Sequence, residues 1–174
     1  LRKSLLTQRL TEVAQLEFDC VRSLAQMELA GIGLDVERWQ EYGQWVKQQL
    51  LHYQAQVRHH FRDWQPQPDQ PLNPNSPQQL NSALSFLGIE VGSTAKDKLE
   101  PLSEQPVIAD LLQYKHWQSQ DSKYVDKIRQ AVHPKTGRIH AQYFQLGADT
   151  GRLSCRKPPL QQIPRQPQVR SCFV

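Results

Sequence analysis

The chain has 174 residues, a formal net charge of +4 and an apolar fraction of 38%. This length accommodates one domain and part of a second, and the composition is that of a folded chain rather than a disordered one. No stretch reaches the roughly 18 consecutive apolar residues of a membrane span, and the N-terminus carries neither a signal peptide nor an initiator Met. We therefore expect no membrane contact and interpret the sequence as a piece of a longer protein.

The cysteines Cys20, Cys155 and Cys172 have no metal-ligand spacing, and their odd number argues against a disulfide framework. They indicate a reducing compartment and hence a cytoplasmic protein. His59 and His60 are an adjacent pair, but neighbouring helix positions point about 100° apart, so they form a poor chelate. We predict no metal site in this chain.

Positive charge is concentrated in the second part of the sequence. Residues 1–70 carry 8 basic and 9 acidic side chains, whereas residues 71–174 carry 13 basic and 8 acidic ones, a net of +5. No carboxylate side chain follows Asp149. The cations after it are Arg152, Arg156, Lys157, Arg165 and Arg170. Cations without neighbouring carboxylates suit a polyanion-binding surface, although such an excess is also common in proteins of other functions.

Two long amphipathic helices are predicted first, because apolar side chains recur at intervals of three and four. We interpret both stripes as core. The first comprises Leu6, Leu10, Val13, Leu16, Cys20, Leu24 and Met27, and the second Trp39, Tyr42, Val46, Leu50, Tyr53, Val57 and Phe61. Gly31 suits the left-handed C-cap of the first helix, and Asp35 suits the N-cap of the second.

A proline-rich crossing follows at residues 64–77 and excludes a helix, because proline lacks a backbone N–H. Ser76 then suits an N-cap and Pro77 the first helical position, which predicts a short helix to about Gly88. Another short helical piece is expected over residues 92–102.

A long helix is predicted from Pro106 to about Val132. Its polar middle, residues 118–123, is expected to project into solvent or towards a ligand. From Arg138 the apolar period changes towards two, which predicts a strand, and a second strand is expected over residues 152–155. The fold class is therefore mainly α, with long antiparallel helices, a small helical tip and a short C-terminal β-hairpin.

The sequence offers no convincing catalytic set. Two-metal chemistry on nucleic acid needs several carboxylates at one site, and the basic C-terminal segment has none after Asp149. The acidic residues at positions 35, 37 and 41 fit ordinary helix-start charges. Ser154 beside Cys155 has no general base at a recognisable spacing.

Binding chemistry has two candidate stretches. Residues 73–76, Asn-Pro-Asn-Ser, stand directly before a helix N-terminus, where free N–H groups favour a phosphate. Residues 92–96 offer a similar start, and simple helix capping explains both about equally well. In residues 150–165, Arg and Gln side chains suit the O2 and N3 acceptors of a minor groove, a readout nearly blind to base sequence.

Several motifs in order resemble family A DNA polymerases, the DNA polymerase I type. Residues 150–154 (Thr-Gly-Arg-Leu-Ser), 160–165 (Leu-Gln-Gln-Ile-Pro-Arg) and 170–173 (Arg-Ser-Cys-Phe) closely resemble the first polymerase motif. Upstream similarities cover the start of the polymerase region, the thumb tip, the second long thumb helix and the lead into the palm, at residues 27–35, 73–80, 111–124 and 133–140. The short spacing in the first motif is similar to cyanobacterial and phage variants.

The resemblance implies a polymerase thumb plus the first palm strands. The implied domains are residues 1–34, a helix connecting to the palm base; residues 35–137, the thumb; and residues 138–174, the first palm strands with an extended segment. In the family the thumb grips primer–template duplex across its minor groove. Carried over to this sequence, the backbone-phosphate contacts are Asn73, Asn75, Ser76, Ser93, Thr94, Lys115 and Ser122. Arg152 is expected at the primer terminus, and Gln161, Gln162 and Arg165 on the template side.

Four positions depart from the family pattern. Lys115 stands where Arg is usual, which keeps the charge but loses the bidentate fork. Ser119 replaces a usual Lys, while Phe144 and Pro159 each replace a usual Asn. Because these changes remove polar or cationic contacts, we expect weaker duplex affinity than in a typical member.

The resemblance implies a duplex-binding fragment of a DNA-directed DNA polymerase, acting in DNA replication or repair at the bacterial nucleoid. The family's catalytic aspartates and dNTP-binding fingers lie beyond Val174, so the chain alone is expected to be inactive, without a cofactor and with Mg²⁺ only when joined to the missing palm. Its expected partners are double-stranded or primer–template DNA and the rest of the polymerase: palm, fingers and, in some members, an exonuclease domain. Two alternatives stay open: a stand-alone DNA-binding or adaptor module derived from a polymerase, and a helical protein–protein scaffold.

Overall fold

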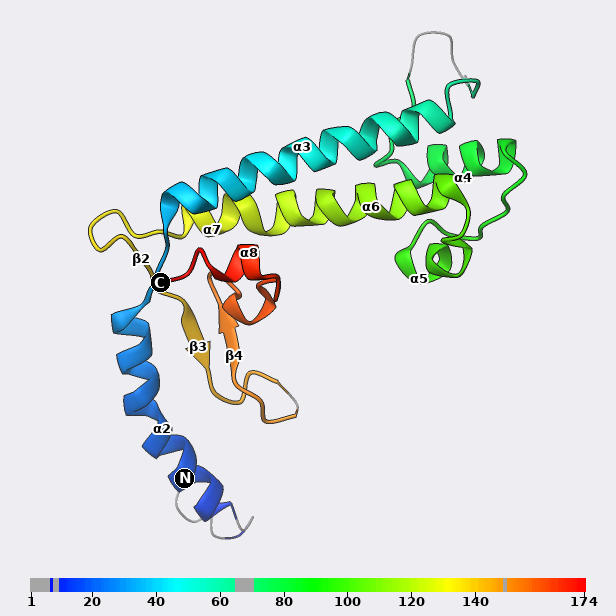
Figure 1. Ribbon diagram of the computed structural model, residues 1–174. Coiled ribbons are helices and arrows are strands. Elements are labelled where there is room, and N and C mark those ends of the chain that lie inside the picture. The colour runs from blue at the N-terminus through cyan, green and yellow to red at the C-terminus, as the bar shows by residue number, and fades with distance from the viewer. Residues whose placement is uncertain (1–6, 8–9, 65–70, 149) are drawn as a thin grey trace. The chain divides into compact units, whose positions relative to one another are not determined.

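The computed structural model describes residues 7, 10–64, 71–148 and 150–174. The chain divides into two compact units, unit 1 (Leu1–Gln40 with Val125–Val174) and unit 2 (Glu41–Tyr124). Helix α3 (Val36–His60) begins in unit 1 and continues through unit 2 (Figure 1). The described elements are mostly helices, with two small two-stranded antiparallel sheets, so the mainly α fold class is confirmed.

Unit 2 contains the predicted antiparallel helices. α3 lies beside α6 (Pro106–Gln120), as Figure 1 shows. The Tyr42 hydroxyl donates to Gln120 Oε1 at 3.4 Å, and His60 Nε2 lies 2.8 Å from Asp110 Oδ2. Because later positions on α3 meet earlier positions on α6, the two helices run in opposite directions.

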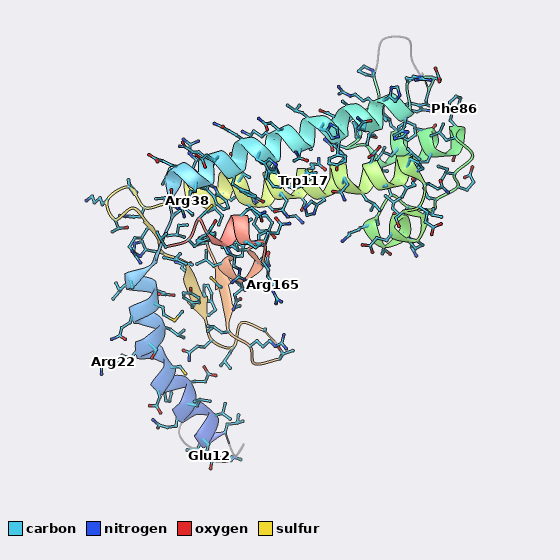
Figure 2. All side chains as sticks on the ribbon, in the orientation of Figure 1. Glu12, Arg22, Arg38, Phe86, Trp117 and Arg165 are labelled. Carbon is cyan, nitrogen blue, oxygen red and sulfur yellow. The ribbon has the colours of Figure 1, made fainter. Side chains whose placement is uncertain are left out.

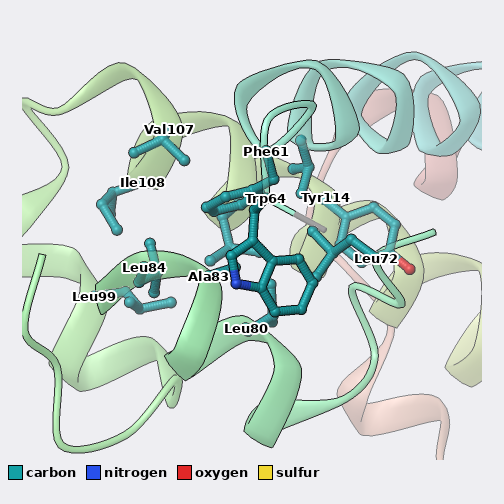
Figure 3. Close-up of a cluster of buried hydrophobic side chains, with 12 residues drawn as sticks. Phe61, Trp64, Leu72, Leu80, Ala83, Leu84, Leu99, Val107, Ile108 and Tyr114 are labelled. Atoms are coloured by element: carbon teal, nitrogen blue, oxygen red, sulfur yellow. The ribbon is translucent and has the colours of Figure 1, made fainter. Parts of the chain in front are cut away.

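The core of unit 2 lies where α3 and α6 meet the small helix α4 (Pro77–Phe86) and the single turn α5 (Lys96–Leu99). Figure 3 shows its buried side chains, which come from segments far apart in the sequence. The cluster comprises Val57, Phe61, Trp64, Leu72, Leu80, Ala83, Leu84, Leu99, Val107, Ile108, Leu111 and Tyr114. Burial of one Leu or Phe side chain contributes about 1.5–3 kcal/mol, so this cluster dominates the stability of the unit.

Helix α4 begins as the sequence predicts. The Ser76 hydroxyl accepts the backbone N–H of Gln79 at 3.4 Å, and Pro77 occupies the first helical position. Since Pro lacks the N–H that a first-turn residue leaves unpaired, this start costs no hydrogen bond. The helix ends at Phe86, close to the predicted end.

The predicted helix from Pro106 to Val132 is interrupted. α6 ends at Gln120, a π-helical turn covers Asp121–Val125, and α7 covers Asp126–Gln130. Period-based prediction assumes 3.6 residues per turn and does not detect this wider turn. The polar middle does not project wholly into solvent either, because Gln120 is only 8% exposed and accepts from Tyr42.

The first helix of unit 1, α2 (Thr11–Ala30), corrects one prediction. Its apolar stripe was expected to be core, but no described residue of α2 is buried, and Leu16 and Met27 are 62% and 48% exposed. Leu6 lies outside the described residues. The intervals of three and four identify an amphipathic face correctly, but they cannot specify what covers it. The second stripe is confirmed as core at Trp39, Tyr42, Val46, Val57 and Phe61, with Leu50 and Tyr53 partly buried.

The two sheets belong to unit 1. β3 (Gln142–Phe144) and β4 (Ser154–Arg156) form the predicted C-terminal hairpin, with Tyr143 opposite Cys155. A pairing that was not predicted joins β1 (Ile32–Gly33) to β2 (Arg138–Ile139). Beyond the hairpin lie a 3₁₀ turn (Leu160–Gln162) and the short helix α8 (Pro167–Arg170).

The C-terminal end of α2 is fastened to β2. Gly31 follows the last residue of α2, and its N–H donates to Met27 O. Its φ of +63° and ψ of −178° lie in a region that essentially only Gly adopts, but they are not the left-handed helical values that were predicted for the C-cap. The Arg138 guanidinium donates to the carbonyls of Ala30 and Gly31, at 2.7 and 3.1 Å. A side chain at Gly31 has no room, because an added Cβ would lie 2.8 Å from the carbonyl oxygen of Ile139.

Over the described residues, none of the helices has the length and apolar character that crossing a bilayer requires.

Candidate nucleic-acid interface

The first candidate surface is the loop before α4 in unit 2, which we call the tip loop (residues 71–76). Asn73 Oδ1 accepts the backbone N–H of Asn75 at 3.0 Å, and the Ser76 N–H donates to Asn73 O at 3.0 Å. The Gln79 side chain reaches back from α4 and accepts the Asn73 N–H at 2.8 Å. These local bonds fix the loop while Asn73 and Asn75 stay exposed.

The tip loop is fastened to α6 through Asn75. Its Oδ1 accepts a hydrogen bond from the Tyr114 hydroxyl at 2.8 Å and another from Gln118 Nε2. Ser122 continues this row, since its hydroxyl donates to the Gln118 carbonyl at 2.8 Å. Positions 114, 118 and 122 are four apart, which places them along one helix face. The row therefore brings together two predicted contacts, Asn75 and Ser122, that are far apart in sequence.

Lys115 is a half-buried cation on α6. Burial lowers the pKa of its ammonium group, because desolvation penalises the charged form. Its charge is not neutralised within the described part of the chain, where no carboxylate forms an ion pair with it. The pKa of the neighbouring His116 is also lowered, first by burial and then by the charge of Lys96.

Ser93 and Thr94 occupy the turn that leads into α5. The Ser93 hydroxyl accepts the Ala95 N–H at 3.2 Å, and Thr94 is only 4% exposed. Within the described residues, no side-chain hydrogen bond connects either residue to the tip loop. In this conformation both serve the turn itself, and their phosphate contacts stay predictions.

The second candidate surface lies in unit 1 and contains Arg152, Gln161, Gln162 and Arg165, all exposed. Gln161 Nε2 donates to the Leu153 carbonyl at 2.9 Å, which fixes the segment after β4 beside the residue that follows Arg152. Figure 2 shows the Arg165 side chain on this C-terminal segment. This hydrogen bond therefore joins residues 150–154 to residues 160–165, the two parts of the motif.

The second surface and the segment that carries it contain four arginines without an ion pair among the described residues. None of Arg152, Arg156, Arg165 and Arg170 forms an ion pair with a carboxylate that the structure describes. The Arg156 guanidinium instead lies over the Phe144 ring, 4.9 Å from its centroid. Within residues 150–174, all of which the structure describes, there are cations but no carboxylate side chain, so this segment is positively charged.

The sequence did not identify the residues that orient the predicted contacts. Gln118 was assigned only to the polar middle of its predicted helix, and neither Tyr114 nor Gln79 was assigned to a contact. The spacing of 114, 118 and 122 was a usable signal, but the partner of this face, Asn75, lies 39 positions from Tyr114. The predicted residues fall into a unit 2 set and a unit 1 set. Hydrogen bonds connect Asn73, Asn75 and, through Gln118, Ser122 in unit 2, and they join Gln161 to the Leu153 carbonyl in unit 1.

Metal chemistry has no support in the described residues. They contain no group of three or more His, Cys, Asp or Glu side chains that could hold a metal ion. The Mg²⁺ of two-metal nucleotidyl transfer needs converging carboxylates, so these residues do not fit it.

An open hollow of about 730 Å³ in unit 1 includes none of the predicted contacts. It is lined by Glu28, His133, Thr136 and His140 among others. His140 Nδ1 lies 2.8 Å from the Glu28 carbonyl oxygen, and its Nε2 lies 2.8 Å from the Thr136 hydroxyl. Both ring nitrogens are thus already satisfied, and the hollow offers little polar chemistry to a ligand.

The chain is similar to known polymerases over most of its length. The family model for DNA polymerase family A matches residues 39–174 of this chain. DNA polymerase I of Chloroflexus aurantiacus is 36% identical over 178 residues, covering 92% of this chain and 18% of that protein. The thermostable DNA polymerase I of Thermus aquaticus is 34% identical over 166 residues, covering 87% of this chain and 19% of that protein.

A solved structure shares the fold. The POL domain of Pol1 from M. smegmatis, in complex with DNA primer–template and dNTP, superposes with a TM-score of 0.76 at 29% identity. The match covers 91% of this chain and 29% of that one. The chain thus spans about a fifth of the length of the curated relatives named above. Because the family model covers most of its residues, this chain belongs to DNA polymerase family A.

Proposed function

We propose that the chain is the duplex-binding thumb region of a family A DNA polymerase together with the first strands of its palm, and that it binds primer–template without catalysing synthesis. The domain limits at residues 34 and 137 belong to this proposal. The proposed role is in DNA replication or repair at the bacterial nucleoid. Support comes from family membership and from the M. smegmatis relative, which is described in complex with primer–template DNA.

The observation that carries the proposal is the set of exposed, unopposed cations around Gln161. Arg152 and Arg165 are exposed and form no ion pair with a described carboxylate, while Gln161 is fixed against the Leu153 backbone. Guanidinium and carboxamide groups donate to the O2 and N3 acceptors that every base pair presents in the minor groove. Such a surface binds duplex with little preference for base sequence.

The test is the binding of a fluorescent primer–template by the 174-residue chain at several salt concentrations. The logarithm of affinity should fall with the logarithm of salt by about 0.9 for each phosphate neutralised. Arg152→Ala should weaken binding about tenfold or more, because a charged hydrogen bond is lost. Arg22→Ala on α2 removes an exposed guanidinium outside both candidate surfaces and is the matched control. A flat salt response, or equal losses for both variants, would contradict the proposal.

Catalysis, in this proposal, belongs to the rest of the polymerase. We place the Mg²⁺ site, which needs converging carboxylates, and the dNTP-binding fingers in segments outside this chain, as the resemblance to the family implies. The palm and fingers, with an exonuclease domain in some members, are accordingly its proposed protein partners.

A second candidate is a non-catalytic DNA-binding or adaptor module derived from a polymerase. It is favoured by Phe144 and Pro159, which stand exposed at positions where hydrogen-bonding side chains are expected, and by the stacking of Arg156 on Phe144. The coding sequence after position 174 separates the two. An aspartate-bearing palm strand shortly downstream supports the polymerase, whereas a stop codon supports the adaptor.

A further inference from the structure

The two asparagines of the tip loop present the same chemical end outward. Asn73 Oδ1 is engaged by the Asn75 N–H, and Asn75 Oδ1 is engaged by Tyr114 and Gln118. No hydrogen bond from either side-chain Nδ2 is found among the described residues. Both side chains are exposed. The carboxamide oxygens of Asn73 and Asn75 therefore bond to the protein, and their side-chain N–H groups are available to a ligand.

The donors on α6 are what set the orientation of Asn75. Burial raises the pKa of the Tyr114 phenol, although its bond to Asn75 and the charge of Arg58 act in the opposite direction, so the hydroxyl keeps its proton at neutral pH. Gln118 Nε2 carries only N–H groups. If the Asn75 carboxamide were rotated by 180°, its own N–H groups would face those of Gln118, and this arrangement is unfavourable.

We propose that Tyr114 and Gln118 are positioning residues that hold the Asn75 carboxamide with its nitrogen outward. The outward end of this side chain then offers N–H donors to a ligand that presents acceptors, the phosphate oxygens of a nucleic acid strand. This inference rests on the proposed duplex-binding function and adds to it the means by which the Asn75 carboxamide is oriented. A fixed donor loses less rotational freedom on binding than a free one, so its orientation adds affinity without adding a contact. It also adds no charge.

A double-mutant cycle on the full 174-residue chain tests the proposal, with affinity for primer–template as the readout. Tyr114→Phe and Gln118→Met each remove one donor, and each should weaken binding about two- to tenfold. In an Asn75→Ala background the same changes should have no further effect, because there is no carboxamide left to orient. Tyr53→Phe removes a tyrosine hydroxyl elsewhere in unit 2 and should leave affinity unchanged.

Asn75→Asp provides the sharpest variant. The carboxylate still accepts from Tyr114 and Gln118, so the loop stays fastened to α6, but an anionic oxygen now faces outward. Binding should be weaker than for Asn75→Ala, because the outward group repels phosphate rather than merely losing a contact. Equal affinities of the two variants would overturn the proposal, as would losses from Tyr114→Phe and Gln118→Met that persist undiminished in the Asn75→Ala background.

A measurement without DNA separates this inference from the function on which it rests. The side-chain NH₂ protons of Asn75 should exchange rapidly with water in the unmodified chain, and their NMR resonances should shift in Tyr114→Phe. Protected NH₂ protons, or resonances that do not respond, would overturn the orientation itself. Failure of the unmodified chain to bind primer–template, with the NMR result as expected, would refute duplex binding and leave the orientation of Asn75 intact.

Discussion

Uncharged donors and charged donors are distributed differently between the two candidate surfaces. The tip loop relies on the carboxamides of Asn73 and Asn75, held by hydrogen bonds, whereas the second surface relies on guanidinium groups such as Arg152 and Arg165. A neutral donor releases no counterion on binding phosphate, while a cation does. Variants at the tip loop should therefore change affinity with little change in its salt dependence, in contrast to variants that remove a phosphate-binding cation.

His116 gives unit 2 a weak sensitivity to acid. Because burial and Lys96 lower its pKa, the unfolded chain binds a proton more readily than the folded one, and the free energy of unfolding should fall as the pH drops below 6.5 through the folded pKa. His116→Gln should lose less stability than the unmodified chain between pH 7.5 and pH 5, as measured by urea unfolding. Lys96→Met should show an intermediate loss, since it removes only the second cause. Identical losses in all three chains would show that His116 does not contribute.

At the scale of elements, the sequence predicts well what neighbours in the chain decide. The Ser76 cap, the end of α2 before Gly31 and the β3–β4 hairpin all follow from local propensities, and each is confirmed. The pairing of β1 with β2 joins segments more than a hundred positions apart, and no local pattern specifies it. The π-helical turn at Asp121–Val125 departs from the assumed helical period, so a continuous helix was predicted there.

The residues of the candidate site also divide into those that the sequence predicts and those that only the fold reveals. The resemblance to a family identified Asn75 and Ser122 by their positions in motifs. The structure adds the hydrogen bonds through Gln118 that connect them. Tyr114 and Gln118 become visible only when the fold brings α6 against the tip loop. The exposure of the α2 stripe is a further limit, because burial depends on a partner surface that periodicity does not encode.

The junction of α2 and β2 provides a stability test at this scale. Gly31→Ala should destabilise the chain, because φ of +63° with ψ of −178° costs an L-residue about 1–3 kcal/mol and the new Cβ would also meet the Ile139 carbonyl. Gly137→Ala is the matched control, since Gly137 has φ of +64° and nothing within 4 Å of an added Cβ. Urea unfolding should show a larger loss for Gly31→Ala. Equal losses would mean that the close approach to Ile139 is relieved without cost.

At the scale of the whole molecule, unit 2 contains its own hydrophobic core. All twelve buried side chains of the cluster lie between positions 57 and 114, inside Glu41–Tyr124. A unit with its own core can in principle fold alone. We predict that residues 41–124, expressed separately, give a helical circular dichroism spectrum and a single cooperative thermal transition. A broad, gradual transition would show that unit 2 depends on the remaining residues for its packing.

The hydrogen bond between Tyr42 and Gln120 has a practical consequence. It holds the entry and the exit of unit 2 next to each other, so that the intervening polypeptide forms one continuous loop out and back. We expect that residues 42–120 can be exchanged between family members as one segment, because the backbone on either side of the segment would keep its position. Under the proposed duplex-binding function, a chimaera that receives this segment from another family member should acquire that member's affinity for duplex DNA.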